Sequence, residues 1–364
     1  MSSSSEISEK KFLEKFMKES FSEEDARLLL SSEVPLDEVL NTAEYFRKKY
    51  FENYVQIHVI NNIKNGYCQE DCGYCAQRKG AGENEIIKYY TKSEDEILKE
   101  AESAYKSGAF RYCLVTSGRG PGEKHIHQYA DLIQKIKSLY PMEICLSAGL
   151  LTDPDHAKLL AEAGLNRYNH NINSSENHYG EICTSHDFQD RIRTLQNMSQ
   201  NGVGLCSGVI AGMGESDEDL VRMAFQLKKL GSASIPVNFF IPVPGHAVKN
   251  MNFLTPEKCL RILSLFRLVN PSSEIRMAAG REYYLKDKQQ DGLRAANSLF
   301  VSGYLNVKGD DAYETVCMIH RAGYKIDTKY SEMPEIKDGG EGLTLSDVFH
   351  DIVIKDEKDL RPFQ

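Results

Sequence analysis

Short β-rich runs recur along the chain, and each run is followed by a Gly, Pro, Asn or Ser break and then by a charged amphipathic stretch. Eight such runs can be read, at 55–63, 110–118, 143–151, 166–173, 203–212, 234–243, 274–282 and 298–307. Strands that alternate with helices in this way predict an α/β fold, a parallel (β/α)8 barrel of the TIM type. Two doubly wound sets of four strands are the alternative. The length of 364 residues allows one barrel with extensions.

The two ends of the chain differ from this pattern. Residues 1–53 predict an N-terminal helical extension packed outside the main fold, because Leu28 to Leu30 and Leu36 to Leu40 form apolar faces and Ser22 begins a capping sequence. Residues 330–364 are rich in Asp, Glu, Lys and Gly, with one apolar patch at 345–354. We interpret them as a C-terminal extension that is largely solvated, or else docked on the fold or on a partner. The barrel then occupies residues 54–329.

Composition and charge exclude several classes of function. The net charge is −9 and no block of Lys and Arg could follow a phosphate backbone, so we expect no nucleic-acid partner. The first residues lack the layout of a secretory signal, and no apolar run is long enough for a membrane span. We therefore expect a cytoplasmic protein. In that compartment its nine cysteines indicate metal ligands, redox groups or small core residues before disulfides.

Unusual polar residues inside the runs follow a period of two. Arg111 and Cys113 share one face of their strand, and Asn169, Asn171 and Asn173 share one face of theirs. Both faces of a barrel strand are covered, so we expect these residues to point into the lumen. Most of them lie toward the C-terminal strand ends, where parallel barrels have their active sites.

Three cysteines, Cys68, Cys72 and Cys75, follow the first predicted strand on one loop. Thiolates at this spacing bind zinc or an iron–sulfur cluster. A closed zinc site or a fully ligated cube would need four protein ligands. Three ligands leave one metal position open for a small reactive molecule, although zinc with an unidentified fourth ligand is an alternative.

The C-x3-C-x2-C spacing, with Tyr74 directly before the last cysteine, resembles the signature of the radical S-adenosylmethionine (SAM) superfamily. The stretch GVIAGMGE at 208–215 resembles the glycine-rich motif that this superfamily uses beside the adenine, although any strand-to-helix turn could need such glycines. The resemblance implies a [4Fe–4S] cluster at Cys68, Cys72 and Cys75 whose open iron binds SAM. The residues implied in SAM binding by these two motifs are Tyr74, Gly208, Ile210, Gly212 and Glu215.

Three further cysteines, Cys113, Cys145 and Cys206, lie on the second, third and fifth predicted strands, with Arg276 on the seventh. A single cysteine on a strand is more often a small core residue than a ligand. A buried guanidinium, in contrast, must face an anion, because burial of an unpaired charge is costly. Three thiolates with their metal would supply that anion.

The segments RYC, EICLSAG, RYNHNIN, GLCSGVIAG, PVNFF and RMAAGRE, in this order, resemble the biotin synthase family from about Val55 to Tyr324. The resemblance implies an auxiliary [2Fe–2S] cluster held by Cys113, Cys145, Cys206 and Arg276, although spacing alone does not define its nuclearity. It also implies a sulfurtransferase reaction in which a 5′-deoxyadenosyl radical from SAM removes hydrogen from dethiobiotin. The auxiliary cluster then supplies sulfur, and biotin is formed.

The same resemblance assigns further site residues. Asn169, Asn171 and Asn238 would bind the ureido ring of the substrate, and Asn171 and Asn173 would bind SAM through its ribose. Arg111 and Ser298 would support the cluster region. The chain departs from some members at Asn173, where they have Asp, and at 306–307, where Asn-Val replaces a Thr-Thr near the substrate carboxylate. Cys183 matches neither ligand set, and we interpret it as structural.

The resemblance further implies a homodimer and an electron donor such as a flavodoxin or a ferredoxin. Two other interpretations stay open at this point. Another radical SAM enzyme, of the maturase or mutase type, would share the first motif without explaining the barrel cysteines and Arg276. A non-catalytic zinc-binding scaffold would use Cys68, Cys72 and Cys75 alone.

Overall fold

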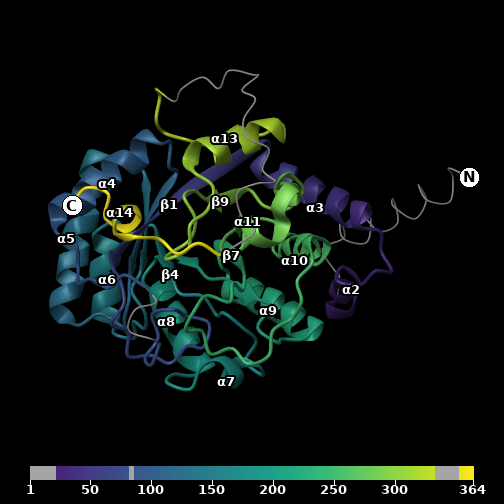
Figure 1. The fold of residues 1–364 in the computed structure, drawn as a ribbon, viewed down its shortest axis with the longest axis horizontal. Helices are drawn as coiled ribbons and strands as arrows, with labels where there is room; N and C mark the ends of the chain where they lie inside the picture. The colour runs from purple at the N-terminus through teal and green to yellow at the C-terminus, as the bar shows by residue number, and fades with distance from the viewer. Residues whose placement is uncertain (1–21, 82–85, 333–351) are drawn as a thin grey trace, which may run out of the picture.

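The computed structural model describes residues 22–81, 86–332 and 352–364 (Figure 1). Within these residues one ten-stranded sheet forms the centre of the molecule. Its strands are β1 (Tyr54–Lys64), β2 (Arg111–Thr116), β3 (Glu143–Ser147), β4 (Arg167–Asn169), β5 (Gly204–Cys206), β6 (Val209–Ala211), β7 (Ser234–Phe239), β8 (Glu274–Met277), β9 (Ser298–Phe300) and β10 (Lys325–Ile326).

The sheet closes into a parallel barrel. Neighbouring strands pair in parallel from β1 through β5, then through β7 and β8 to β9, and β9 returns to pair with β1 at Gln56–Ser298 and His58–Phe300. All eight predicted runs contain barrel strands, so the (β/α)8 prediction is confirmed and the alternative of two doubly wound sets is wrong. The short strand β10 pairs with the start of β1.

The fifth predicted run, 203–212, is divided into β5 and β6 by Ser207 and Gly208. A Cβ atom built on Gly208 would lie 1.9 Å from the carbonyl oxygen of Pro236 on β7. Only glycine allows the two backbones to approach so closely, and the strand resumes at Val209, which pairs with Val237.

Helices surround the barrel, and capping residues define where several of them begin. Ser93, Asp187 and Ser216 each form a capping box at the start of a helix. The helices are α2 (Glu23–Leu28), α3 (Leu36–Phe51), α4 (Glu94–Lys106), α5 (Glu123–Leu139), α6 (Pro154–Glu162), α7 (Tyr179–Ile182), α8 (Phe188–Gln200), α9 (Asp217–Leu230), α10 (Pro256–Val269), α11 (Arg281–Leu285), the 3-10 helix η1 (Lys286–Lys288), α12 (Gln289–Gly292), α13 (Ala312–Arg321) and α14 (Glu357–Leu360). In the described parts of the chain, no helix is long and apolar enough to cross a membrane.

The N-terminal helices pack on the outside of the barrel, as predicted. Ser22 caps α2 with its hydroxyl oxygen, which accepts a hydrogen bond from the Asp25 N–H. Helix α3 packs against α10, and its buried Arg47 donates to the carbonyl of Tyr54 at 2.7 Å. The part of the predicted helical stretch before residue 22 lies outside the described residues, and the division of the chain at 53 and 329 stays a prediction.

The alternation of the barrel strands separates two groups of buried side chains. On β2, Tyr112 and Leu114 belong to the main hydrophobic core between barrel and helices, whereas Cys113 belongs to a second cluster inside the barrel. Cys145, paired with Cys113 in register, joins this inner cluster. The prediction that Cys113 points into the lumen is therefore confirmed.

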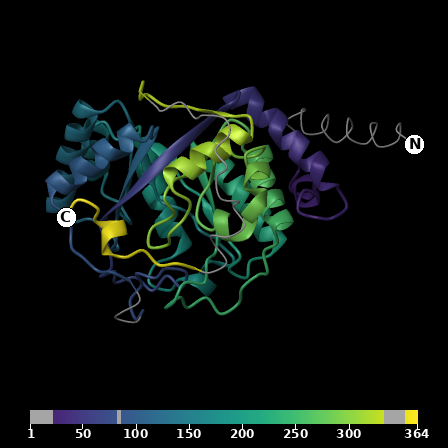
Figure 2. The same cartoon turned by 45° about the horizontal axis from the view of Figure 1, so that its top comes forward.

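The end of the chain returns to the barrel. Most of the predicted apolar patch at 345–354 lies outside the described residues, but residues 352–364 are described and lie beside the loop that follows β9. Ile354 forms an antiparallel bridge with Val307 there. In Figures 1 and 2 this yellow segment crosses the molecule and ends beside α4 and α5. The described end of the tail is therefore docked.

Candidate active site

A cavity of about 300 Å³ lies at the C-terminal ends of the barrel strands. It is lined by all three loop cysteines and by two of the three barrel cysteines, Cys113 and Cys145, and Arg276 reaches it from β8. Cys206 belongs to the same inner cluster, where Cys145 contacts both Cys113 and Cys206. The structure therefore brings both predicted thiol sets to one cavity, at the end of the barrel where chemistry is expected.

Cys68, Cys72 and Cys75 lie on the loop between β1 and α4, and all are free thiols. Backbone hydrogen bonds hold this loop in place: the Gly73 N–H donates to Ile182 O at 2.7 Å, and the Cys75 N–H donates to Cys72 O at 3.0 Å. Burial raises the pKa of the Cys75 thiol to about 11. The thiol is therefore protonated near neutral pH, and a metal would have to displace the proton.

Tyr74 also lines the cavity and is held by two donors. Its hydroxyl oxygen accepts hydrogen bonds from Asn173 Nδ2 at 2.5 Å and from Arg191 Nη2 at 3.1 Å. Arg191 also donates to the backbone carbonyl of Asn171 at 2.9 Å. Two predicted SAM-binding residues, Tyr74 on the first loop and Asn173 after β4, are thus in contact. The buried guanidinium of Arg191, which the sequence analysis did not identify, links this loop to the segment after β4.

The asparagines around β4 bind each other as well as facing the cavity. Asn171 Oδ1 accepts hydrogen bonds from Asn169 Nδ2 at 3.2 Å and from the Gly208 N–H at 3.0 Å. Asn169 Nδ2 also lies 3.3 Å from Cys206 Sγ. Asn169, Asn171 and Asn173 all line the cavity. The amide of Asn169 is therefore a neighbour of the barrel thiols.

The glycine-rich stretch at 208–215 contains strand β6 and the turn that follows it, and only part of the stretch reaches the cavity. Ile210 lines the cavity. Gly208, Gly212 and Glu215 do not line it; the buried Glu215 carboxylate accepts hydrogen bonds from the backbone N–H groups of Gly212 and Met213 at 2.7 and 2.8 Å. Gly208 precedes β6, and Gly212 and Glu215 belong to the turn that follows it, so these three residues flank the strand that carries Ile210.

Cys113, Cys145 and Cys206 form the inner cluster together with Ala278 and Phe300. The hydrogen bond with Cys145, helped by the positive charges of Arg276 and Arg111, lowers the pKa of the Cys206 thiol to about 5, against the opposing effect of burial. The hydrogen bonds of Cys145 to Cys113 and Cys206 raise its own pKa. A cationic environment of this kind favours a thiolate at Cys206.

Arg276 lies between these thiols and a buried carboxylate. Its Nη1 atom is 3.6 Å from Cys206 Sγ, and its Nε atom donates to Glu274 Oε1 at 3.1 Å, with Nη2 donating to the same oxygen. The guanidinium also lies over the ring of Phe300, 4.9 Å from its centroid. We predicted that a buried Arg276 must face an anion, and Glu274 supplies part of that negative charge.

Glu274 is the centre of a buried charge network that sequence reasoning missed. Its carboxylate accepts hydrogen bonds from Arg111 Nη1 at 2.7 Å and from Ser298 Oγ at 2.8 Å. Burial alone would raise its pKa, but Arg111 and Arg276 hold the pKa of Glu274 well below its ordinary value. Glu274 precedes Arg276 by two positions on one strand, so the period of two could have identified the pair.

Arg111 and Ser298 thus act through Glu274. Neither residue lines the cavity, and Arg111 is further held by Glu143, whose carboxylate accepts from its Nε at 2.9 Å and its Nη2 at 2.6 Å. Their expected role as supporting residues fits these contacts. Asn238 does line the cavity, but its Nδ2 donates to Val209 O at 2.8 Å and its Oδ1 accepts from the Ala279 N–H at 3.1 Å.

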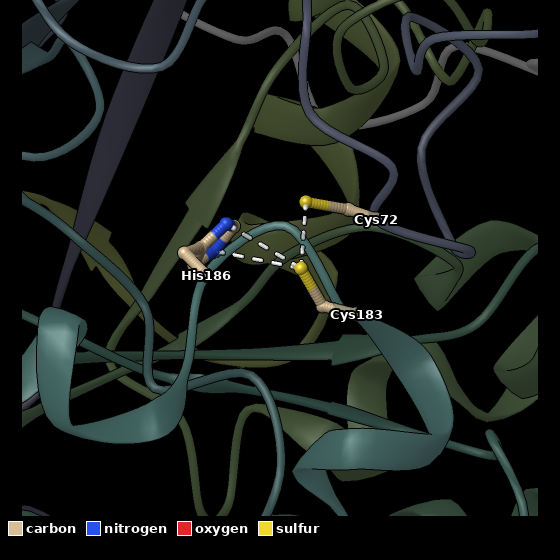
Figure 3. A group of neighbouring side chains, drawn as sticks. All are labelled: Cys72, Cys183 and His186. Carbon is tan, nitrogen blue, oxygen red and sulfur yellow. Dashed lines mark hydrogen bonds between the residues drawn. The ribbon is translucent and has the colours of Figure 1, made fainter.

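Behind the cysteine loop lies a group of three side chains, Cys72, Cys183 and His186 (Figure 3). Cys183 Sγ is 3.8 Å from Cys72 Sγ and 3.4 Å from His186 Nδ1. Cys183 follows α7 and does not line the cavity, whereas His186 does. This proximity joins positions more than a hundred residues apart in sequence, and no local pattern indicated it.

The residues fit iron–sulfur chemistry. Three thiols of the loop between β1 and α4 reach the cavity, and the described part of that loop holds no fourth cysteine. A second group of three thiols lies deeper in the barrel, beside the guanidinium of Arg276. Thiolates are the soft ligands that iron–sulfur clusters require. The arrangement leaves space in the cavity for small molecules between the two thiol sets.

Solved structures of two other proteins share this architecture. The chain superposes on the FeFe-hydrogenase maturase HydG from Carboxydothermus hydrogenoformans with a TM-score of 0.75 at 17% identity, covering 90% of this chain and 80% of that one. For methylornithine synthase (PylB) the TM-score is 0.74 at 19% identity, covering 87% and 97%. At these identities the likeness shows the shared fold alone.

Two family models match the chain. The Radical SAM superfamily model matches residues 62–227, and the Biotin and Thiamin Synthesis associated domain model matches residues 236–325. The second match covers β7 to β10, where Arg276 lies. Neither a zinc scaffold nor a maturase-type enzyme is favoured by this pair of matches.

Curated relatives agree over most of the chain. Biotin synthase of Leptospira interrogans is 54% identical over 316 residues, 87% of each protein. Biotin synthase of Leptospira biflexa is 54% identical over 82% of this chain and 84% of its own, and that of Magnetococcus marinus is 47% identical over 83% and 93%. The chain therefore belongs to the biotin synthase family, whose members are radical SAM sulfurtransferase enzymes that use SAM and iron–sulfur clusters.

Proposed function

We propose that the cavity binds dethiobiotin and SAM and converts dethiobiotin to biotin by inserting sulfur between two of its carbon atoms. The observation that supports this best is the meeting of two thiol sets and a buried guanidinium at one cavity. A single metal site would explain the loop thiols, but it would leave Cys113, Cys145, Cys206 and Arg276 without a function.

In this proposal Cys68, Cys72 and Cys75 hold a [4Fe–4S] cluster, with SAM at its open iron. Tyr74, Asn171, Asn173 and Ile210 are placed to bind SAM, since all four line the cavity beside the loop. Gly208, Gly212 and Glu215 act indirectly by fixing the two ends of β6, the strand that carries Ile210. When bound, the first cluster and SAM would supply a 5′-deoxyadenosyl radical, which removes hydrogen atoms from the substrate. The auxiliary cluster would supply the sulfur that replaces them.

Cys113, Cys145, Cys206 and Arg276 hold the auxiliary cluster, a [2Fe–2S] cluster by resemblance. Arginine is a weak metal ligand, and its guanidinium here is already bound on one side by Glu274. Such a ligand suits a centre that must release sulfide, because it binds less firmly than a fourth thiolate would. Arg111 and Ser298 keep the Glu274 carboxylate in position.

Asn169 and Asn238 are placed to orient the ureido ring. Both line the cavity, and Asn169 lies next to Cys206, so a substrate bound there would have its carbon atoms near the auxiliary thiols. Each amide uses part of its hydrogen-bonding capacity within the protein and keeps a second N–H or lone pair for a ligand. Apolar residues such as Ile60 and Phe300 line the same cavity and limit its water.

The wider context follows from the same assignment. We propose a cytoplasmic homodimer that receives electrons from a flavodoxin or a ferredoxin. The net charge of −9 supports the absence of a nucleic-acid partner.

The test is an oxygen-free preparation in which iron and sulfide are counted per chain before and after a single turnover with SAM, reductant and dethiobiotin. Two kinds of iron–sulfur centre, biotin as product and loss of sulfide from one centre support the proposal. Colourless protein that contains zinc, or intact auxiliary sulfide after biotin has formed, contradicts it.

A further inference from the structure

The described end of the chain binds the loop that closes one side of the cavity. We call residues 352–361 the C-terminal segment and residues 304–308 the rim loop. The Lys308 N–H donates to Val353 O at 2.9 Å, and the Lys355 N–H donates to Asn306 O at 2.8 Å. Between these bonds Val307 and Ile354 form an antiparallel bridge. The C-terminal segment thus adds a short strand to the rim loop.

Side chains of the C-terminal segment bind both the rim loop and helix α4. Asp359 forms an ion pair with Lys308 at 2.7 Å. Arg361 donates from Nε and Nη2 to the two carboxylate oxygens of Glu96 on α4, each at 2.9 Å, and lies over the ring of Tyr89, 5.3 Å from its centroid. A two-pronged arginine contact to a carboxylate is among the stronger kinds of ion pair. The segment therefore ties the rim loop after β9 to α4, the helix that follows the neighbouring strand β1.

The rim loop forms part of the cavity wall. Tyr304 packs on the inner thiol cluster, and Leu305, Asn306 and Val307 line the cavity beyond it. Asn306 is buried, and its Oδ1 accepts a hydrogen bond from Asn65 Nδ2 at 2.7 Å. The loop therefore extends from the auxiliary thiols outward along the side of the cavity.

The rim loop makes a sharp turn, across which the Tyr304 N–H donates to Val307 O at 3.0 Å and the Val307 N–H donates to Tyr304 O at 2.9 Å. Leu305 has a φ of 47°, and Ser302 just before the loop has a φ of 62°. Residues with a Cβ rarely adopt this left-handed region unless their surroundings impose it. The backbone bonds from the C-terminal segment add to the bonds within the loop, since they fix Asn306, directly after Leu305, and Lys308, at the end of the loop.

We propose that the C-terminal segment is a substrate-positioning element, which sets the affinity for dethiobiotin by holding the rim loop against the carboxylate-bearing chain of the substrate. The inference rests on the proposed function. The ureido ring is assigned to Asn169 and Asn238 near the auxiliary thiols, so the other end of the substrate lies toward the rim. The C-terminal segment binds the backbone of the rim loop, so it would act on the substrate through the rim loop.

The test compares two substitutions at one position. Lys355→Pro removes the backbone N–H that binds Asn306, whereas Lys355→Ala removes the same side chain and keeps the N–H. Ile354, the residue before, is in an extended bridge, the conformation that a following proline favours. We expect Lys355→Pro to raise the KM for dethiobiotin about tenfold and Lys355→Ala to change it less than about twofold. The kcat and the iron content should stay at the wild-type level in both.

A second pair tests the other end of the segment. Arg361→Ala removes the contact with Glu96, and Lys358→Ala on the exposed face of α14 is the matched control. We expect a rise in KM for Arg361→Ala of about threefold to tenfold and none for Lys358→Ala.

Dethiobiotin binding is also measured directly by calorimetry on oxygen-free enzyme loaded with SAM. If wild type binds no dethiobiotin, the proposed function fails. If wild type binds it and Lys355→Pro binds it equally well, the inference alone is overturned. A Lys355→Ala enzyme as impaired as Lys355→Pro, or variants that lose iron and kcat with an unchanged KM, would also overturn it.

Discussion

Arg276 Nη1 lies 3.6 Å from Cys206 Sγ, while the same guanidinium donates to Glu274 from its other side. Arg276 is therefore balanced between a thiol and a carboxylate, both buried. If only the thiols bound the guanidinium, its position would depend on the metal centre. If only Glu274 bound it, the guanidinium would not contact that centre. In the proposed function, this shared position would keep the guanidinium in place while the auxiliary centre gives up sulfide.

Replacement of Arg276 by alanine should weaken retention of the auxiliary centre. Oxygen-free Arg276→Ala protein is expected to contain less iron and sulfide than wild type and to lose more of both in a single turnover, since one ligand and the charge that stabilises the Cys206 thiolate are gone. Arg276→Lys keeps the positive charge but lacks the planar guanidinium, so its iron and sulfide contents should lie between those of wild type and Arg276→Ala. Equal iron and sulfide counts in all three proteins would show that Arg276 is not a ligand.

Replacement of Glu274 by glutamine should destabilise the fold itself. Arg111 and Arg276 would then share a buried site without their common carboxylate, a change that costs about 3 to 5 kcal/mol in comparable buried pairs. The free energy of unfolding in urea measures this. Glu143→Gln is the matched control, because Glu143 binds Arg111 from a more exposed position and its loss should cost less than about 1 kcal/mol. Similar losses for both variants would contradict a special role for Glu274.

Stability should also depend on pH through Glu274. The pKa of its carboxyl is well below the ordinary 4.5, so the folded protein binds this proton only at a much lower pH than the unfolded chain does. Its contribution is complete above pH 4.5 and is lost as the pH falls below that value, by up to about 1.4 kcal/mol per pH unit. Urea unfolding of wild type and Glu274→Gln between pH 3 and 6, a range of about three units around that value, should show a steeper decline for wild type. Parallel curves would refute this.

Cys72 and Cys183 should differ in function although their sulfur atoms are 3.8 Å apart. Cys72 lines the cavity and Cys183 does not, so Cys72→Ala is expected to lose the iron of one centre and Cys183→Ala to keep the wild-type iron content. Iron counts and visible absorption of oxygen-free protein measure both. Iron loss in Cys183→Ala equal to that in Cys72→Ala would mean that Cys183 is a ligand.

The two thiol sets could be found from the sequence for different reasons. Cys68, Cys72 and Cys75 are close in sequence, so one loop must bring them together. Cys113, Cys145 and Cys206 are far apart, but they lie on strands whose order and alternation follow from the barrel pattern, and the pairing of Cys113 with Cys145 is a direct consequence. The family resemblance added their role.

Other features depended on contacts that no local pattern reports. Glu274 lies two residues before Arg276, yet its importance appears only in the fold, where Arg111 reaches it from β2 across the inside of the barrel. Gly208 and Glu215 matched a binding motif, but in the fold they lie before and after β6, away from the cavity that Ile210 lines.

The sequence by itself determined the barrel, because hydrophobic periodicity and turn residues act over short stretches, and it determined the two thiol sets through their positions on those strands and on one loop. Only the tertiary structure decided that Cys183 lies against Cys72 and that residues 352–361 return to the rim loop. These contacts join distant parts of the chain through single hydrogen bonds, ion pairs and a short bridge, whose partners are selected by the complete fold and not by the residues next to them.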